Sequence, residues 1–358
     1  MVTVLGIACA VFLMVFQGSV LWGFLGAASK VIDSTDADIW ITGRGVQCFE
    51  FPVIMERRFV ELAHSVPGVG STSRISTNFA QFRKTDGTHQ LVALVGADAE
   101  VGRQFPIPHL PGDTGAIAPE ALLVDQSNAE LLNIPLQLPV DVEINDQRAR
   151  VIGLTSGFSS FLGSPYVFTS YADGARYMRL RPEETMFILV RLQQDASVLA
   201  VQKGLKIRLP NVDVWTREEF ARQARFYWIS KTGAGGAILM AALLGFLVGL
   251  AVASQAIYAT TMENIEEFAT LKALGASHAF IMRVIITQAF ICGIGGYLLG
   301  VLLTMPVVHA VKAGIPWVST PDWLPVSVLA PTLAMCILAS IVSVKAALAI
   351  EPAKVFRA

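Results

Sequence analysis

Residues 233–258, GAGGAILMAALLGFLVGLAVASQAIY, decide the fold class because they form an apolar run without a single charged side chain. A helix needs about 20 such residues to cross the hydrocarbon core of a bilayer. Three further segments meet that length, 3–28, 284–305 and 326–349, and Lys345 is the one charged residue in them. The sequence therefore predicts an α-helical membrane protein with four transmembrane helices.

The first of these segments, 3–28, could also be a cleaved signal peptide. A signal peptide carries a basic region ahead of a short apolar core. No basic residue precedes this segment, and its apolar run is longer than such a core. We therefore expect a retained transmembrane helix.

The charged residues gather between the first two spans. They make up 15 % of the chain, against about 25 % in soluble domains, and residues 29–231 hold 44 of the 55. The pattern predicts a polar domain inserted between spans one and two. The formal net charge of −1 gives no reason to expect a nucleic-acid partner.

Lysines and arginines near the spans indicate the orientation, because short cytoplasmic loops are enriched in them. The side that holds residues 259–283 and the C-terminus carries five, whereas the opposite loop, 306–325, has only Lys312. We therefore place 259–283 and both termini in the cytoplasm, and 29–231 on the outer side.

The outer domain has the mixed pattern of an α+β fold. Strand-like alternation occurs at 36–43, two β-rich runs at 74–98 flank Asp86-Gly87 as in a hairpin, and short strands recur at about 114–160, where a sub-domain could begin. Helical spacing occurs within 55–69 and at 170–180, 196–208 and 216–231. In the last helix Thr216 and Glu219 have the spacing of a capping box, and Phe226, Tyr227 and Trp228 are expected at the membrane surface.

No set of residues argues for catalysis or for a metal. The glycines of 233–237 lack the Gly-Lys-Ser/Thr of a nucleotide-binding loop, and no nucleophile elbow occurs. The five histidines and four cysteines share no ligand spacing. We therefore predict no enzyme activity, no metal and no cofactor for this chain.

Small residues four apart occur in two spans, as Gly245 with Gly249 and Gly296 with Gly300. Such pairs let helix backbones approach closely in lipid, either within one chain or between subunits. Four polar residues also lie inside spans and are expected to face protein, where they either form interhelical hydrogen bonds or line a substrate path. They are Ser254, Gln255, Thr287 and Gln288.

The stretch EEFATLKALGAS, residues 266–277, breaks the apolar pattern between spans two and three. On a helical wheel its acids and Thr270 share an arc of about 100°, while apolar residues such as Phe268 and Leu271 occupy the rest. Gly275 can end this helix in the left-handed conformation, and Ser277 can cap the next one. The stretch is either a solvated turn or a docking helix that offers its apolar side to a partner's groove and its acids to the rim.

Three stretches carry a resemblance to a known family: NVDVWTREEFARQARFYW (211–228), GFLVGLAVASQAIYAT (245–260) and IEEFATLKALGAS (265–277). They resemble the permease subunits of the FtsX/MacB/LolC superfamily of ABC transporters, and most closely the DevC-type permeases of glycolipid exporters. DADIWI (36–41) and LLVDQSNAELLNI (122–134) are similar to that family's periplasmic domain. Members usually carry a basic amphipathic stretch ahead of the first span, which here begins almost at Met1.

The resemblance implies a domain plan. It assigns 1–28 to the first transmembrane helix, 29–231 to a MacB-like periplasmic domain, 232–350 to an FtsX-like permease domain with three helices, and 351–358 to a cytoplasmic tail. It places the chain in the bacterial inner membrane. It makes 266–277 part of the coupling helix that docks on the ATPase, with these residues: Glu263, Glu266, Glu267, Phe268, Ala269, Leu271, Lys272, Leu274 and Gly275.

The resemblance also implies partners. ATP and Mg²⁺ would bind a separate cytoplasmic ATPase subunit, the permease would form a homodimer among membrane lipids, and a periplasmic adaptor with an outer-membrane channel could complete an export path. The cargo would be a lipid, a lipoprotein or another amphipathic molecule. The alternative is an FtsX-like signal transmitter that activates a periplasmic partner such as a cell-wall hydrolase. A membrane-anchored enzyme is a third reading.

Overall fold

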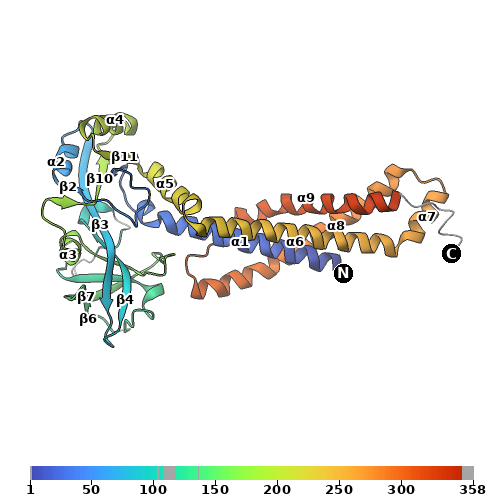
Figure 1. Cartoon of the computed structure of the whole chain (residues 1–358), viewed down its shortest axis with the longest axis horizontal. Helices are drawn as coiled ribbons and strands as arrows, with labels where there is room; N and C mark the ends of the chain where they lie inside the picture. The colour runs from blue at the N-terminus through green and yellow to red at the C-terminus, as the bar shows by residue number, and fades with distance from the viewer. Residues whose placement is uncertain (1, 103–104, 108–117, 136, 349–358) are drawn as a thin grey trace. The chain divides into compact units, whose positions relative to one another are not determined.

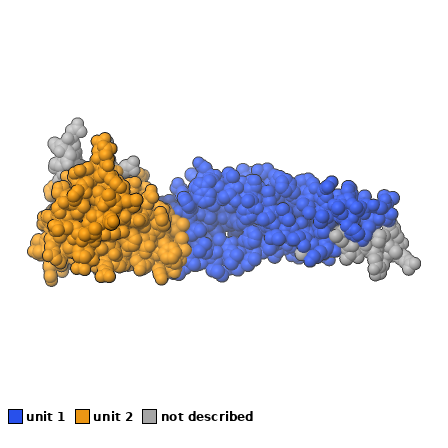
Figure 2. All heavy atoms as spheres, turned by 90° about the horizontal axis from the view of Figure 1, so that it is seen from above, with its two compact units in different colours: residues 1–23, 233–358 blue, residues 24–232 orange. Residues whose placement is uncertain are grey.

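The chain folds into two compact units, residues 1–23 with 233–358 and residues 24–232 (Figure 2). The structure is a computed structural model that describes residues 2–102, 105–107, 118–135 and 137–348. We call residues 1–23 with 233–358 the helical unit and residues 24–232 the sheet unit. The division falls inside the first helix, α1, whose beginning belongs to the helical unit and whose end belongs to the sheet unit.

The sheet unit is built on a nine-stranded sheet with the order β11-β1-β10-β3-β4-β8-β5-β7-β6. Its strands are β1 Ile39–Gly43, β3 Val69–Arg83, β4 His89–Ala97, β5 Ala121–Asp125, β6 Val140–Ile144, β7 Gln147–Thr155, β8 Tyr166–Ser170, β10 Phe187–Leu192 and β11 Val212–Thr216. A small second sheet pairs β2 Met55–Glu56 with β9 Glu184–Thr185. The α-helices are α2 Arg58–His64, α3 Tyr171–Tyr177, α4 Val198–Arg208 and α5 Arg217–Ser230, and two 3-10 turns cover Ala99–Val101 and Gln126–Asn128.

The predicted hairpin is confirmed as β3 and β4, which pair antiparallel from Ile75 opposite Ala97 to Arg83 opposite His89. Its turn includes Gly87 at φ +83°, a left-handed conformation that glycine adopts without strain. The strands between 121 and 155 join this same sheet through β5, β6 and β7. Their apolar residues, among them Leu122, Val142 and Val151, share one hydrophobic cluster with Phe82 of β3 and Leu94 of β4.

The helical unit confirms the four apolar helices (Figure 1). Their bounds are α1 Val2–Asp33, α6 Gly233–Glu263, α8 His278–Gly314 and α9 Trp323–Leu348, and the short α7 Ile265–Ala273 joins α6 to α8. The fold class is therefore the predicted one, four spans with an α+β domain between the first and second.

The third span is longer than its apolar run predicts. Residues 284–305 lie inside α8, which begins at a Ser277 cap and continues through Pro306 to Gly314, so the expected loop at 306–325 starts later. Proline is tolerated inside a transmembrane helix because neighbouring groups satisfy the freed backbone. The ends of α8 therefore lie at its caps, Ser277 and Ile315, rather than at the ends of the apolar run.

The glycine pairs pack inside the chain, against α1. A Cβ added to Gly296 would lie 2.5 Å from a methyl group of Ile7, and one added to Gly300 would lie 2.7 Å from the carbonyl oxygen of Ala8. On α6, Gly249 faces Ala10 and Gly245 faces Leu13. Larger residues at these sites would push α6 and α8 away from α1, so the absence of a side chain permits the close packing.

Candidate functional site

The short helix α7 carries the predicted coupling residues. It starts after Asn264, so Glu263 is instead the last residue of α6. It ends as predicted at Gly275, which has φ +91°. The amide of Gly275 donates to the carbonyl of Lys272, and the amide of Ala276 donates to that of Leu271, the two bonds of a Schellman motif. Ser277 then accepts from the amide of Phe280 at 3.2 Å and caps α8.

The apolar side of α7 is covered by the chain itself, which corrects the expectation that it faces a partner's groove. Phe268 is 7 % exposed and belongs to a core cluster with residues of α1, α6, α8 and α9. Ala269 is fully buried, and Leu271 packs against the same cluster. The reason is that α7 is too short to be stable alone, so its apolar face joins the nearest helices.

The opposite side of α7 is open. Glu266, Glu267 and Thr270 are exposed, and so is Glu263 at the end of α6. Leu274 follows at the C-terminal end with 81 % of its surface exposed, while Lys272 is half-buried. We call Glu263, Glu266, Glu267, Thr270 and Leu274 the acidic face. It can form ion pairs at its rim and bury one large apolar side chain.

In the sheet unit, the end of α1 and the helix α5 are tied together. Arg225 donates to Asp33 at 2.8 Å and to the hydroxyl of Ser29 at 2.9 Å. Arg217 donates to the carbonyl oxygen of Thr35 at 2.9 Å. The predicted capping box at the start of α5 is present. These bonds connect the end of α1, which follows the first span, to α5, which precedes the second span.

Trp228 of α5 is buried against the protein, which corrects the expectation that it forms an exposed aromatic belt with Phe226 and Tyr227. Its ring packs edge-on against Phe161, with 4.8 Å between centroids, and 6 % of its surface remains exposed. Phe226 is 58 % exposed. The difference follows from helical spacing, since Phe220, Ala221, Ala224 and Trp228 share the buried face of α5.

Beside Trp228 lies Glu50, a buried carboxyl that sequence reasoning missed. Tyr166 donates to one of its oxygens at 3.1 Å and the indole of Trp228 donates to the other at 3.3 Å. Burial is the largest cause that raises the pKa of Glu50 above its usual range. Burial also raises the pKa of the neighbouring Cys48 to about 12. No local sequence signal marks Glu50, because its partners lie 116 and 178 residues away in the chain.

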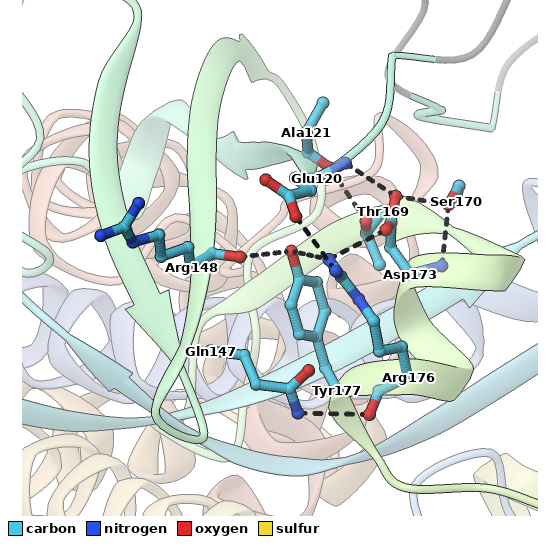
Figure 3. A network of polar contacts seen from close by, with 9 residues as sticks. All are labelled: Glu120, Ala121, Gln147, Arg148, Thr169, Ser170, Asp173, Arg176 and Tyr177. Atoms are coloured by element: carbon cyan, nitrogen blue, oxygen red, sulfur yellow. Dashed lines mark hydrogen bonds and ion pairs between the residues drawn. The ribbon is translucent and has the colours of Figure 1, made fainter.

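A second polar network joins α3 to the strands beside it (Figure 3). Arg176 pairs with Glu120 at 3.0 Å and with Asp173 at 3.1 Å, and it donates to the hydroxyl of Tyr177. Tyr177 in turn donates to the carbonyl oxygen of Arg148. Burial raises the pKa of Tyr177 to about 12. Every group in this network has a partner, so its role is to hold α3 in place.

A cavity of the sheet unit lies near this network, with a volume of about 740 Å³. Four of its charged lining residues pair with one another, Arg83 with Glu143 at 2.9 Å and Arg150 with Asp141 at 2.6 Å. Across the described residues, no group of three or more His, Cys, Asp or Glu could hold a metal ion. Neither observation points to a catalytic centre.

Two of the four polar residues inside spans are uncovered, which corrects the expectation that all four face protein. Gln255 on α6 and Thr287 on α8 are exposed, whereas Ser254 and Gln288 are half-buried. The helical spacing of Gln255 places it on the same outward face as Leu244 and Val248.

Comparison with known families gives two matches that together cover most of the chain. The MacB-like periplasmic core domain matches residues 1–207, and the FtsX-like permease C-terminal domain matches residues 236–352. No curated protein sequence matches the chain.

Three solved structures are similar to part of the chain, each at 12 % identity. The periplasmic region of MacB from Actinobacillus actinomycetemcomitans has a TM-score of 0.41 and covers 53 % of this chain and 94 % of its own. The extracellular domain of the noncanonic ABC-type transporter YknZ from Gram-positive bacteria has 0.38, with 50 % and 99 %. A domain of a putative permease from Porphyromonas gingivalis has 0.34, with 50 % and 88 %. The family matches carry the assignment.

Proposed function

The chain belongs to the FtsX/MacB superfamily as an ABC-type transmembrane subunit of the inner membrane, and from that premise we propose that it couples ATP hydrolysis to movement of its periplasmic domain. Hydrolysis takes place on a separate cytoplasmic ATPase subunit, which binds ATP and Mg²⁺. This chain contributes no cofactor of its own and transmits the motion mechanically.

The acidic face of α7 is the observation that carries this proposal. It offers three carboxylates and one exposed leucine at the connection between two spans. A partner can bury Leu274 and pair basic residues with Glu266 and Glu267, an apolar contact with a polar rim. The open side of α7 therefore suits a docked subunit, whereas its other side is already occupied.

The buried side of α7 supplies the route for the motion. Phe268 belongs to one packed cluster with Ile7 of α1, Ile257 of α6 and Ile281 of α8. Packed interiors transmit displacement because they have few voids. A push on α7 would therefore shift the spans together rather than bend a loose connection.

The spans α1 and α6 are continuous in sequence with the periplasmic sheet unit. The pair Arg225–Asp33 holds the end of α1 against α5, which leads into α6. Motion of either span would then reach the sheet unit through a bonded pair of helices. The exposed pair contributes modest energy by itself, so its role is to keep the two segments in register.

We further propose that two copies form a homodimer and that the cargo is a lipid, a lipoprotein or another amphipathic molecule. A periplasmic adaptor and an outer-membrane channel would complete an export path. The alternative role is that of a signal transmitter that activates a periplasmic hydrolase without moving a cargo.

Co-purification with the cognate ATPase subunit tests the proposal. The full chain in nanodiscs should retain the ATPase, and E266K/E267K should lose most of that binding. E218K, which reverses the charge of an exposed acid on α5 in the sheet unit, serves as the control. Equal retention by E266K/E267K and by the control would exclude docking at the acidic face. Identifying the molecules bound to the intact complex then separates the two roles, since a bound hydrolase without adaptor or cargo would exclude export.

A further inference from the structure

An open groove of about 430 Å³ lies along the cytoplasmic part of α8. Its lining includes Arg283, Thr287 and Ile291, which lie one helical turn apart, and Gln288 beside Thr287. On a helical wheel the first three fall within about 80° of one another, so they form one stripe. This stripe differs from the acidic face of α7 in charge and in position along the chain.

The polar side chains of this stripe are unpaired among the residues that the structure describes. No hydrogen bond or ion pair of the described residues reaches Arg283, Thr287 or Gln288. Other threonines in the spans behave differently: Thr261 and Thr304 each donate to the carbonyl oxygen four residues earlier, at 2.8 and 2.7 Å. Thr287 therefore has a hydroxyl available to an external group. Unpartnered polar groups at membrane depth are costly, so something outside the monomer covers them.

The depth of these groups matches the layers of a phospholipid. Arg283 lies about 8 Å along the axis from the start of α8, just before the apolar run at 284. Thr287 and Gln288 follow one turn deeper, at the level of glycerol and ester oxygens. Beyond them the stripe becomes purely apolar, with Ile291, Leu298 and Leu302 each more than 60 % exposed, and it can receive an acyl chain.

Charge decides between a lipid and a second copy of the chain. In a two-fold dimer about the membrane normal, the same patch of both copies meets at the same depth. Arg283 would then face the partner's Arg283, a repulsive contact. Phosphate suits a guanidinium because it accepts two parallel hydrogen bonds. The cytoplasmic leaflet also carries anionic lipids that basic sites between spans attract.

We propose that the stripe Arg283–Thr287–Gln288–Ile291 is a binding site for an anionic phospholipid of the cytoplasmic leaflet. The guanidinium of Arg283 binds the phosphate, Thr287 and Gln288 bind glycerol or ester oxygens, and the apolar continuation of α8 holds an acyl chain. The site adds lipid recognition to a span that the coupling helix joins directly.

Native mass spectrometry of the full, delipidated chain tests the site. The probes are phosphatidylglycerol and phosphatidylcholine with the same acyl chains. The chain should prefer phosphatidylglycerol by about fivefold, the effect of one cation near an anionic headgroup. R283Q should remove that preference, because it weakens phosphatidylglycerol binding more than phosphatidylcholine binding. K312Q, which removes an exposed cation from the other end of the same helix, should keep the preference.

Two outcomes would overturn the proposal. One is an equal preference in the chain and in R283Q, or equal loss in K312Q. The other is efficient disulfide crosslinking between copies through I291C in a C9S/C292S background, which removes the exposed Cys9, since this would assign the stripe to a second copy. Size-exclusion profiles of the variants confirm that each remains folded.

Discussion

Leu274 provides the sharpest test of the acidic face, because 81 % of its surface is exposed at the end of α7. Burying a leucine side chain completely contributes about 1.5–3 kcal/mol. If a docked ATPase subunit covers Leu274, the change L274A removes about 2 kcal/mol of that contact. The dissociation constant should then rise by about thirtyfold. The helix itself is preserved, because alanine favours helical structure at least as well as leucine.

The assay is binding of the purified ATPase subunit to the full chain in nanodiscs, together with the ATPase concentration that gives half-maximal hydrolysis. L298A is the matched control, since Leu298 is 61 % exposed on α8 within the apolar run and makes the same truncation away from α7. In L274A the dissociation constant and the ATPase concentration for half-maximal hydrolysis should rise together. In L298A neither quantity should change. A dissociation constant within threefold of the unchanged chain would refute docking through Leu274, and an equal loss in L298A would refute the specificity of the effect.

Three further predictions concern the rest of the chain. F268A should lower the yield of folded protein and the melting temperature, because emptying a core site costs about 3–5 kcal/mol in soluble proteins; selective loss of ATPase binding at unchanged stability would contradict its buried place. E50Q should flatten the pH dependence of unfolding. Because the pKa of Glu50 is raised, its contribution to the free energy of unfolding is present at acidic pH and is lost as the pH rises above the ordinary carboxyl range. Melting temperatures of the two proteins that change in parallel from pH 4 to 9 would contradict this prediction. G296L should destabilise the helical unit more than G314L, because a side chain at Gly296 meets Ile7 whereas one at Gly314 meets open space; equal thermal stability of the two variants in detergent would disprove the packing argument.

Much of the candidate site was predictable because its signals are local. The acids of α7, the end at Gly275 and the cap at Ser277 all follow from residues within a few positions of one another. The side of α7 that a partner can reach was not predictable from the helical wheel. The wheel separates an apolar face from an acidic face, but it does not say that Phe268 already packs against other helices.

Glu50 and the α8 stripe were also not predictable, because their burial and exposure depend on packing between distant segments. Burial raises the pKa of Glu50 and outweighs the lowering by the hydrogen bonds that Tyr166 of β8 and Trp228 of α5 donate to it. Thr287 and Gln288 are polar residues in a span, for which the usual expectation is a protein neighbour. Only the packing of the helices leaves Thr287 exposed.

The sequence by itself determined the four spans, the inserted α+β domain, the capping box of α5 and the end of α7. These features depend on the length of apolar runs and on hydrogen bonds between residues close in the chain. The tertiary structure decided which faces are covered: it buried Phe268 and Trp228, placed the glycines against α1 and left Leu274 and the α8 stripe open. Burial depends on contacts between segments far apart in the sequence, so the local pattern names the residues of a face while the packing decides what that face meets.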